Sequence, residues 1–262
     1  MSRQNFYKTR KVRKRREVDE KHIKKLVNRE RVLHPRLGGL KVYNRISSDM
    51  KRSGIRIGRD KFFEVLRNQD LLVEPLPRKP RTTCSSHSLG VYDNKVKGME
   101  ISRPNQVWAS DITYIRTLDD FLYLSLITDM YSRKIVGYNL GGNLESEETL
   151  KALGMALKEK PAKALPIHHS DRGSQYCCHE YVDLLKANNL GISMTEKNHC
   201  AENALAERVN GILKQEYYLG GEFRNMEDAL KAVKQAVYLY NTCRPHRSLK
   251  MKTPAEVHGV AA

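Results

Sequence analysis

The sequence predicts an α/β domain built on a mixed sheet, preceded by a smaller, basic all-α domain. Three observations support this class. Apolar residues recur at helical spacing in the first third of the chain, whereas beyond residue 104 they also form short strand-like segments. A proline-rich basic stretch separates the two patterns. The charge divides in the same way, because residues 1–104 hold 28 Lys and Arg against 11 Asp and Glu, and residues 105–262 hold 19 of each.

The overall composition excludes several classes of protein. The 262 residues carry a formal net charge of +17, and 40% are hydrophobic, which is enough for a packed core and argues against a disordered chain. No apolar run approaches the ~18 residues of a membrane span. The basic N-terminus lacks the apolar stretch of a secretory signal. Five cysteines in such a chain indicate reduced thiols, so we expect a cytoplasmic protein with no membrane partner.

The N-terminal segment, residues 1–34, is predicted to be a basic arm followed by a helix over 17–33. Residues 1–25 contain 11 basic and 3 acidic side chains. This density is typical of a solvated, disordered tail and also of an arm that follows DNA phosphates and releases their counterions. The two interpretations are compatible. The candidate phosphate contacts are Arg10, Lys11, Arg13, Lys14, Arg15 and Arg16.

Residues 35–74 are predicted to form a helix-turn-helix domain. Helices are expected over 39–50 and 61–72, with a short turn over 54–58 between them. In that arrangement Arg59, Lys61 and Arg67 would face DNA. A three-helix bundle with basic surface residues and no DNA contact is the alternative.

A stiff basic linker is predicted over residues 75–104. Three prolines among residues 75–83 exclude a helix or a central strand. Arg78 and Lys79 in this stretch are further candidates for contact with a phosphate backbone.

The second domain, residues 105–262, is predicted to be a mixed five-stranded sheet with helices. Three strands joined by short turns imply an antiparallel meander, and helices and strands then alternate before two final helices. The strands are expected over 107–116, 121–128, 134–140, 165–169 and 190–194, and the helices over 146–160, 174–188, 201–218 and 226–240.

Three carboxylates stand out by their positions in these elements. Asp111 lies among apolar residues of the first strand, where a charge is costly unless it is neutralised. Asp171 directly follows the fourth strand, at the kind of edge where α/β sheets form ligand sites. The long helix offers Glu202, Glu207 and Glu216, and the helical period places Glu207 almost opposite the apolar stripe, whereas the other two fall near it.

Convergent carboxylates beside a basic region indicate metal-dependent chemistry on phosphodiesters. Two divalent ions could bridge these oxygens, activate a water or a 3′-hydroxyl and stabilise the leaving oxygen. Oxygen ligands favour Mg²⁺ or Mn²⁺. Lys214, two helical turns after Glu207, could hold a DNA phosphate, and Arg172 is a further candidate. Taken singly, each acid could equally be a solvated loop residue or a helix cap.

Five blocks of the sequence, in order, resemble the catalytic core of insertion-sequence transposases. The closest likeness is to the second-frame product, OrfB, of the IS-three type. Asp171 and Glu207 are separated by 35 residues, which matches the D,D-35-E arrangement of that group. The likeness extends over roughly residues 35–258. The blocks are residues 108–115, 129–137, 169–176, 202–214 and 240–246.

The resemblance implies a ribonuclease-H-like fold in which Asp111, Asp171 and Glu207 bind two Mg²⁺ or Mn²⁺ ions. It implies cleavage of one strand at an element end and attack of the freed 3′-hydroxyl on another phosphodiester. The expected partners are double-stranded DNA, further copies of the chain assembled on that DNA, and an OrfA product that is separate or fused.

Other functions find less support. His168, His169, Cys177 and Cys178 would need adjacent cysteines to share one zinc ion, so we expect His168 and Cys177 to pack instead. No ATP-binding phosphate loop and no serine-hydrolase motif is present. The alternative from another class is a non-catalytic DNA-binding regulator or an inactive transposase remnant. The presence of all three carboxylates and Lys214 favours the enzyme.

Overall fold

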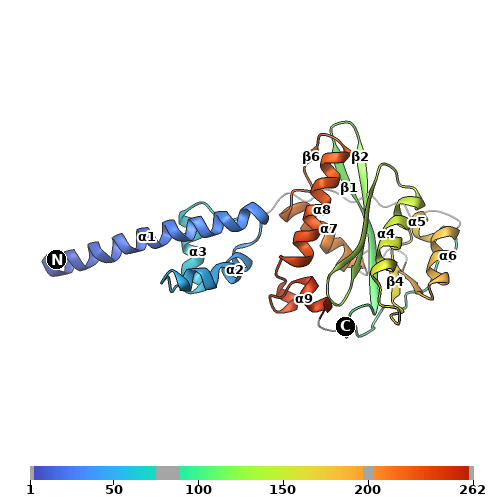
Figure 1. The fold of residues 1–262 in the computed structure, drawn as a ribbon, viewed down its shortest axis with the longest axis horizontal. Coiled ribbons are helices and arrows are strands. Elements are labelled where there is room, and N and C mark those ends of the chain that lie inside the picture. Colours follow the sequence, from blue (N-terminus) through green and yellow to red (C-terminus); the bar gives the residue numbers. More distant parts are fainter. Residues whose placement is uncertain (1–2, 75–88, 197–202, 260–262) are drawn as a thin grey trace. The chain divides into compact units, whose positions relative to one another are not determined.

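A computed structural model describes residues 3–74, 89–196 and 203–259 (Figure 1). The chain divides into two compact units, residues 1–77 and residues 78–262, which are described separately below as the N-terminal unit and the C-terminal unit. None of the helices in the described ranges is long and apolar enough to span a bilayer.

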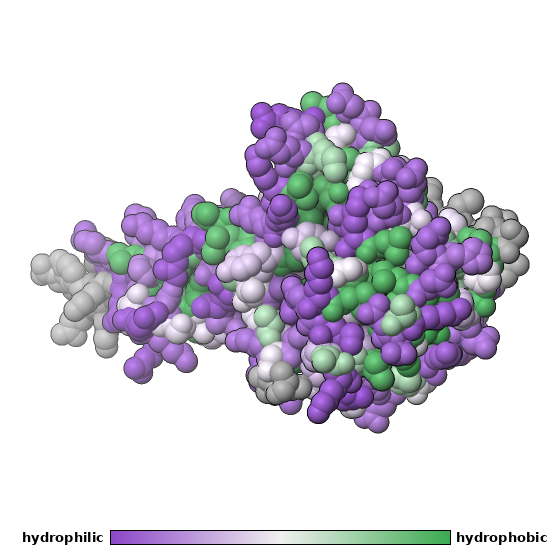
Figure 2. All heavy atoms as spheres, turned by 45° about the vertical axis from the view of Figure 1, so that its right-hand side comes forward, coloured by the Kyte–Doolittle hydropathy of each residue, from purple (hydrophilic) through white to green (hydrophobic). Residues whose placement is uncertain are grey.

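The N-terminal unit consists of helices α1 (Arg3–Leu33), α2 (Gly39–Arg52) and α3 (Arg59–Asn68). They enclose a small core that includes Ile23, Val42, Ile46, Phe62 and Leu66, all at most 1% exposed. The apolar spacing that predicts the three helices therefore also predicts the core. On the face that Figure 2 shows, the coloured part of the N-terminal unit carries mainly hydrophilic residues.

The predicted separate arm is absent, because α1 is one continuous helix that begins at Arg3. Ion pairs one turn apart support the basic stretch, between Arg13 and Glu17 and between Arg16 and Glu20. Arg16 also pairs with Glu64 of α3 at 2.8 Å. Neighbouring acids thus offset part of the repulsion that would favour a disordered tail.

Helices α2 and α3 are joined by a short turn, as the helix-turn-helix pattern predicts. Gly54 has φ +76°, a left-handed conformation that favours glycine, and Ile55 is buried directly after it. Helix α3 ends at Asn68, four residues before the predicted end. Asp70 is left-handed, and the Leu71 amide donates to the Leu66 carbonyl at 2.7 Å, which turns the chain back onto the core.

The C-terminal unit contains a mixed sheet in the order β3-β2-β1-β4-β5. Strands β1, β2 and β3 are antiparallel, and β4 and β5 continue parallel to β1. These are the order and directions of a ribonuclease-H-like sheet, so the predicted fold class is confirmed. A two-residue β6 (Glu222–Phe223) pairs with the end of β1 and was not predicted. The five main strands are β1 (Val107–Thr117), β2 (Phe121–Asp129), β3 (Ile135–Gly141), β4 (Ile167–Ser170) and β5 (Gly191–Met194).

Two helical layers cover the sheet (Figure 1). One cluster of buried residues joins α7 and α8 to one face, and a second joins α4 and α6 to the other. Helix α4 packs closely on β3, since a Cβ at Gly137 would lie 2.3 Å from the Ala152 carbonyl oxygen. The helices are α4 (Ser146–Glu159), α5 (Ser174–Cys177), α6 (His179–Ala187), α7 (Ala204–Glu216), α8 (Met226–Thr242) and α9 (Pro254–Gly259).

Two segments differ from the sequence-based expectation. The single helix predicted over 174–188 is broken at Cys178, whose backbone is extended, so α5 and α6 are separate. Residues 89–104, predicted as linker, belong to the C-terminal unit and pack against its core. Leu89 and Tyr92 contact its core, and the Lys95 amide donates to Ser193 Oγ at 2.9 Å.

Candidate active site

Asp111 lies in the middle of β1 and faces α7. Its neighbour Ile115, four residues on and on the same face, belongs to the cluster that packs against α7 and α8. Both carboxylate oxygens of Asp111 accept hydrogen bonds: Oδ1 from the Ile112 amide at 3.0 Å and Oδ2 from Asn210 Nδ2 at 2.7 Å. The aspartate is therefore held in one orientation by the strand and the helix together.

Asp171 directly follows β4, the parallel neighbour of β1. Its Oδ1 accepts a hydrogen bond from the Gly173 amide at 3.0 Å. A Cβ at position 173 would lie 3.1 Å from that oxygen, so glycine lets the backbone approach the carboxylate. Arg172 holds the same loop to the end of β5, because its Nε donates to the Thr195 carbonyl at 2.7 Å.

Glu207 lies in the first turn of α7 and is half-buried. Lys214, also half-buried, follows seven residues later on the same helix. Helix α7 is fixed by Val209, Ile212 and Leu213, which are buried against the sheet and α8. The predicted apolar stripe thus does bury against the core, and Glu207 lies outside it.

The charges of these acids act on one another. Burial and the negative charges of Asp171 and Glu207 raise the pKa of Asp111 to about 7, against the opposing hydrogen bonds from Asn210 and Ile112. Burial also raises the pKa of Asp171. Across the described ranges, however, no three His, Cys, Asp or Glu side chains converge closely enough to enclose one ion. The fold gathers anionic side chains around Asp111 without forming a closed cage.

Two amides from α7 clamp β1 at this point, and the sequence-based interpretation gave them no role. Asn203 Nδ2 donates to the Ser110 carbonyl at 2.9 Å, and Asn210 Nδ2 donates to Asp111. Both asparagines are 5% exposed. The sequence does place both asparagines on the helical face of Glu207. It does not show their hydrogen-bond acceptors, which lie 93 and 99 residues away along the chain.

A buried polar cluster lies behind the aspartates. His168 Nε2 is 2.7 Å from Ser110 Oγ and 2.9 Å from Tyr181 Oη, and burial lowers the pKa of His168 to about 3, so its ring is neutral. The Tyr176 hydroxyl is buried nearby and has no hydrogen-bond partner among the residues the structure describes. The prediction that His168 packs is confirmed, since it is 1% exposed.

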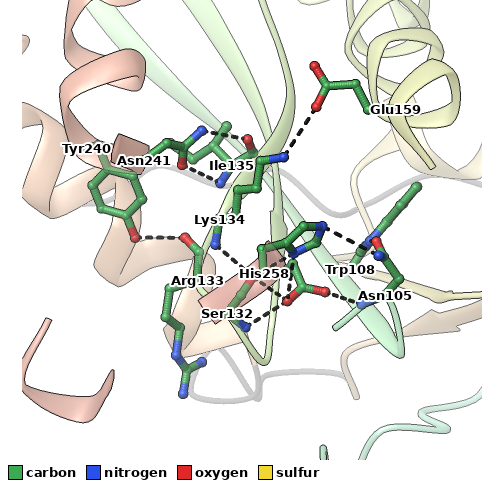
Figure 3. A network of polar contacts seen from close by, with 11 residues as sticks. Asn105, Trp108, Ser132, Arg133, Lys134, Ile135, Glu159, Tyr240, Asn241 and His258 are labelled. Atoms are coloured by element: carbon green, nitrogen blue, oxygen red, sulfur yellow. Dashed lines mark hydrogen bonds and ion pairs between the residues drawn. The ribbon is translucent and has the colours of Figure 1, made fainter. Parts of the chain in front are cut away.

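Asp129, in the second matched block of the sequence, belongs to a structural network at the end of β2 (Figure 3). It is fully buried and accepts hydrogen bonds from the Asn105 amide and from the amide and hydroxyl of Ser132, at 2.6–2.7 Å. Burial would raise its pKa, but hydrogen bonds from His258 and Ser132 outweigh that effect and lower it. Ser132 Oγ is 2.9 Å from His258 Nδ1, yet Ser132 is fully buried, so this Ser-His-Asp grouping cannot act as a nucleophile.

The fifth block also has a structural role. Asn241 bridges α8 to β3, exchanging hydrogen bonds with the amide and carbonyl of Ile135 at 2.9 Å (Figure 3). Arg244, 2% exposed, makes two 2.7 Å contacts with Glu216 at the end of α7. These contacts fix the helix that carries Glu207.

The basic residues predicted to contact DNA fall into three groups. Arg10, Lys14, Arg15 and Arg67 are exposed. Arg13, Arg16, Arg59 and Lys61 form ion pairs with acids: Arg13 with Glu17, Arg16 with Glu20 and Glu64, Arg59 with Asp60, and Lys61 with Glu64. Arg78 and Lys79 lie outside the described residues, as does the side chain of Lys11. DNA contact by all of these residues stays a prediction.

Comparison with known proteins agrees with this architecture. Residues 101–200 and 188–254 match two descriptions of the integrase core domain. The fold resembles that in a simian T-cell lymphotropic virus intasome bound to a PP2A regulatory subunit, with a TM-score of 0.51, 17% identity, and coverage of 84% of this chain and 70% of that one.

Two curated relatives are more similar in sequence. The uncharacterized 31 kDa protein of insertion element IS600 from Shigella sonnei is 36% identical over 80% of this chain and 78% of its own length. The transposase InsF of insertion sequence IS3A from Escherichia coli is 31% identical over 78% of this chain and 69% of its own length. With that identity over most of both chains, and with the integrase core domain in place, this chain belongs to the insertion-sequence transposases of the IS-three type.

Proposed function

We propose that this chain is a DNA transposase whose reaction centre is built around Asp111, Asp171 and Glu207. It would cleave one strand at the ends of its insertion sequence and join the freed 3′-hydroxyl to target DNA. One observation supports this most strongly: Asp111 and Asp171 come from neighbouring parallel strands, and their charges, with that of Glu207, raise the pKa of Asp111 to about 7. A buried group of mutually repelling carboxylates is the environment that a divalent cation relieves.

The residues fit such an ion. All three side chains offer oxygen ligands, which Mg²⁺ and Mn²⁺ prefer, and a cation would offset the cost of ionising Asp111. We propose that the three carboxylates hold two of these ions, which would activate the attacking oxygen and stabilise the leaving one. The chain's own contribution is to orient Asp111 through Asn210 and Asp171 through Gly173.

DNA affinity is proposed to come from outside the carboxylate group, because anionic side chains repel a phosphate backbone. The excess charge of +17 lies within residues 1–104, which include the helix-turn-helix. Arg172 directly follows Asp171 and Lys214 lies two turns after Glu207 on α7, and we propose that these two basic residues contact phosphates. The partners would be double-stranded DNA, further copies of this chain on that DNA, and an OrfA product, all in the cytoplasm.

The test uses a plasmid that carries the DNA flanking the gene on both sides. Purified full-length protein with Mg²⁺ or Mn²⁺ should nick or join strands at the element ends, and Asp171→Asn should abolish this while retaining DNA binding in a mobility-shift assay. Asp183→Asn is the matched control, because Asp183 is exposed on α6. Activity of the Asp171 variant equal to wild type would overturn the site. DNA binding without strand chemistry in the wild type would favour the non-catalytic regulator.

A further inference from the structure

Asn210 has a buried side-chain amide of which only the amino group makes a hydrogen bond. Its side chain is 5% exposed, and Nδ2 donates to Asp111 Oδ2 at 2.7 Å. Its Oδ1 is buried and accepts no hydrogen bond from any residue in the described parts of the chain. A buried acceptor without a donor disfavours folding, so its retention needs an explanation.

The orientation of this amide is set by chemistry. A carboxylate that holds a metal ion is ionised and only accepts hydrogen bonds, so with an ion bound the amino group of Asn210 must face Asp111. A flipped amide would then place two acceptor oxygens against each other. The carbonyl oxygen of Asn210 therefore does not face the Asp111 carboxylate, and the described residues supply it with no donor.

A small donor bound near Asp111 would supply the missing hydrogen bond. Divalent ions held by carboxylates, Mg²⁺ in particular, keep several bound waters, and these waters are strong donors that need acceptors around them. Asn210 also lies one turn after Glu207 on the same helix. Asn210 is thus linked to two of the three proposed ligands, to Asp111 by a hydrogen bond and to Glu207 by its spacing on the helix.

We propose that Asn210 is a positioning residue with two contacts: its amino group orients Asp111, and its carbonyl oxygen accepts a hydrogen bond from a water on the divalent ion. The inference rests on the proposed function, because it needs an ion at Asp111. It assigns a task to a residue outside the three carboxylates. It also explains why an asparagine is suited here, since leucine lacks both polar atoms and aspartate would add a fourth negative charge.

Asn203 provides a matched control. It directly precedes α7, is equally buried, has an Oδ1 that also lacks a donor among the described residues, and donates through Nδ2 to β1, but its target is the Ser110 carbonyl, not a carboxylate. Replacing Asn203 with leucine therefore removes a hydrogen bond of similar length to β1 while keeping the hydrogen bond from Asn210 to the Asp111 carboxylate. The Asn203 variant therefore shows how much metal binding changes when α7 is held less tightly to the strand.

The experiment measures Mn²⁺ binding to the full-length protein without DNA, by loss of the electron paramagnetic resonance signal of free Mn²⁺. Asn210→Leu should weaken binding by roughly 10–100-fold, the usual effect of removing a group that orients a metal ligand. Asn203→Leu should stay within about twofold of wild type. Fluorescence of Trp108, which is the chain's one tryptophan and fully buried in this unit, verifies that each variant is folded. Asn210→Ala serves if the leucine does not fold.

The outcomes separate the two ideas. If Asp111→Asn leaves Mn²⁺ binding unchanged, the metal site itself is wrong and the proposed function fails with it. If Asp111→Asn abolishes binding but folded Asn210 variants bind as tightly as wild type, only the role of Asn210 is overturned. Equal losses in the Asn203 and Asn210 variants would also overturn it, because they would show that any loosening of α7 suffices.

Discussion

Replacing Asp111 with asparagine removes a buried negative charge while keeping the shape of the side chain and an oxygen that can accept from Asn210. The pKa of Asp111 is raised from an ordinary 3.8 to about 7 by burial and by the charges of Asp171 and Glu207. Ionising this carboxyl in the folded protein therefore costs about 4 kcal/mol more than in the unfolded chain, at 1.36 kcal/mol per pKa unit. Without metal, the asparagine variant should be more stable than wild type at alkaline pH.

The raised pKa of Asp111 determines how the stability difference between the two proteins changes with pH. The folded state binds the proton of Asp111 more tightly than the unfolded state, so the stability it contributes is present below pH 3.8 and is lost as the pH rises through about 7. The advantage of Asp111→Asn should grow from about 2 kcal/mol at pH 5 to about 4 kcal/mol at pH 8. All other titrating groups are shared by the two proteins, so they largely cancel in the difference.

The assay is urea unfolding followed by the fluorescence of Trp108, whose burial in the C-terminal unit makes it a probe of that unit alone. Measurements run from pH 5 to pH 8 in a chelator, then with added Mn²⁺. The ion should stabilise the wild type and leave the variant nearly unaffected, since ligand binding stabilises only the state that binds. A difference independent of pH, or a wild type more stable than the variant at pH 8 without metal, would refute the reasoning.

Two pairs of substitutions test the surroundings of the site by the same unfolding assay. Tyr176→Phe removes a buried hydroxyl that has no partner among the described residues, so the free energy of unfolding should be unchanged or rise by up to about 1–3 kcal/mol. Tyr181→Phe removes the 2.9 Å contact with His168 and should lower the free energy of unfolding by about 1 kcal/mol. Equal losses in the two variants would contradict this expectation. Arg244→Ala leaves Glu216 buried without its guanidinium and should cost about 3–5 kcal/mol. The control is Arg224, whose ion pair with Asp228 lies nearer the surface, and Arg224→Ala should lower the free energy of unfolding by less than about 1 kcal/mol. Similar losses for the two arginine variants would show that the pair of Arg244 and Glu216 has no special effect on stability.

Strands were predictable because their signal is local. The strands expected over 107–116 and 121–128 occur as Val107–Thr117 and Phe121–Asp129, since alternating or continuous apolar residues bury the same way in almost any sheet. The order of elements along the chain follows, and with it the position of Asp171 directly after the fourth strand, whereas the pairing of that strand with β1 comes from the structure. The short turns also imply the antiparallel β1-β2-β3 meander.

Features that depend on distant partners were not predictable in this way. Helix α1 reaches Arg3 through a basic run, supported in part by the contact of Arg16 with Glu64. Helix α9 contains His258, whose ring contacts the hydroxyl of Ser132, 126 residues earlier in the chain. The break at Cys178 divides one apolar helical pattern into two helices that pack separately on the sheet. No local pattern contains these contacts.

The sequence by itself determined the basic N-terminal excess, the order of the α/β elements and the spacing of Asp111, Asp171 and Glu207. These are properties of composition and of periodicity along the chain. Only the tertiary structure decided that Asp111 is held by Asn210, 99 residues away, and that its pKa lies near 7. Desolvation and Coulomb repulsion depend on which groups are neighbours in space, and that neighbourhood exists only after α7 has packed onto the sheet.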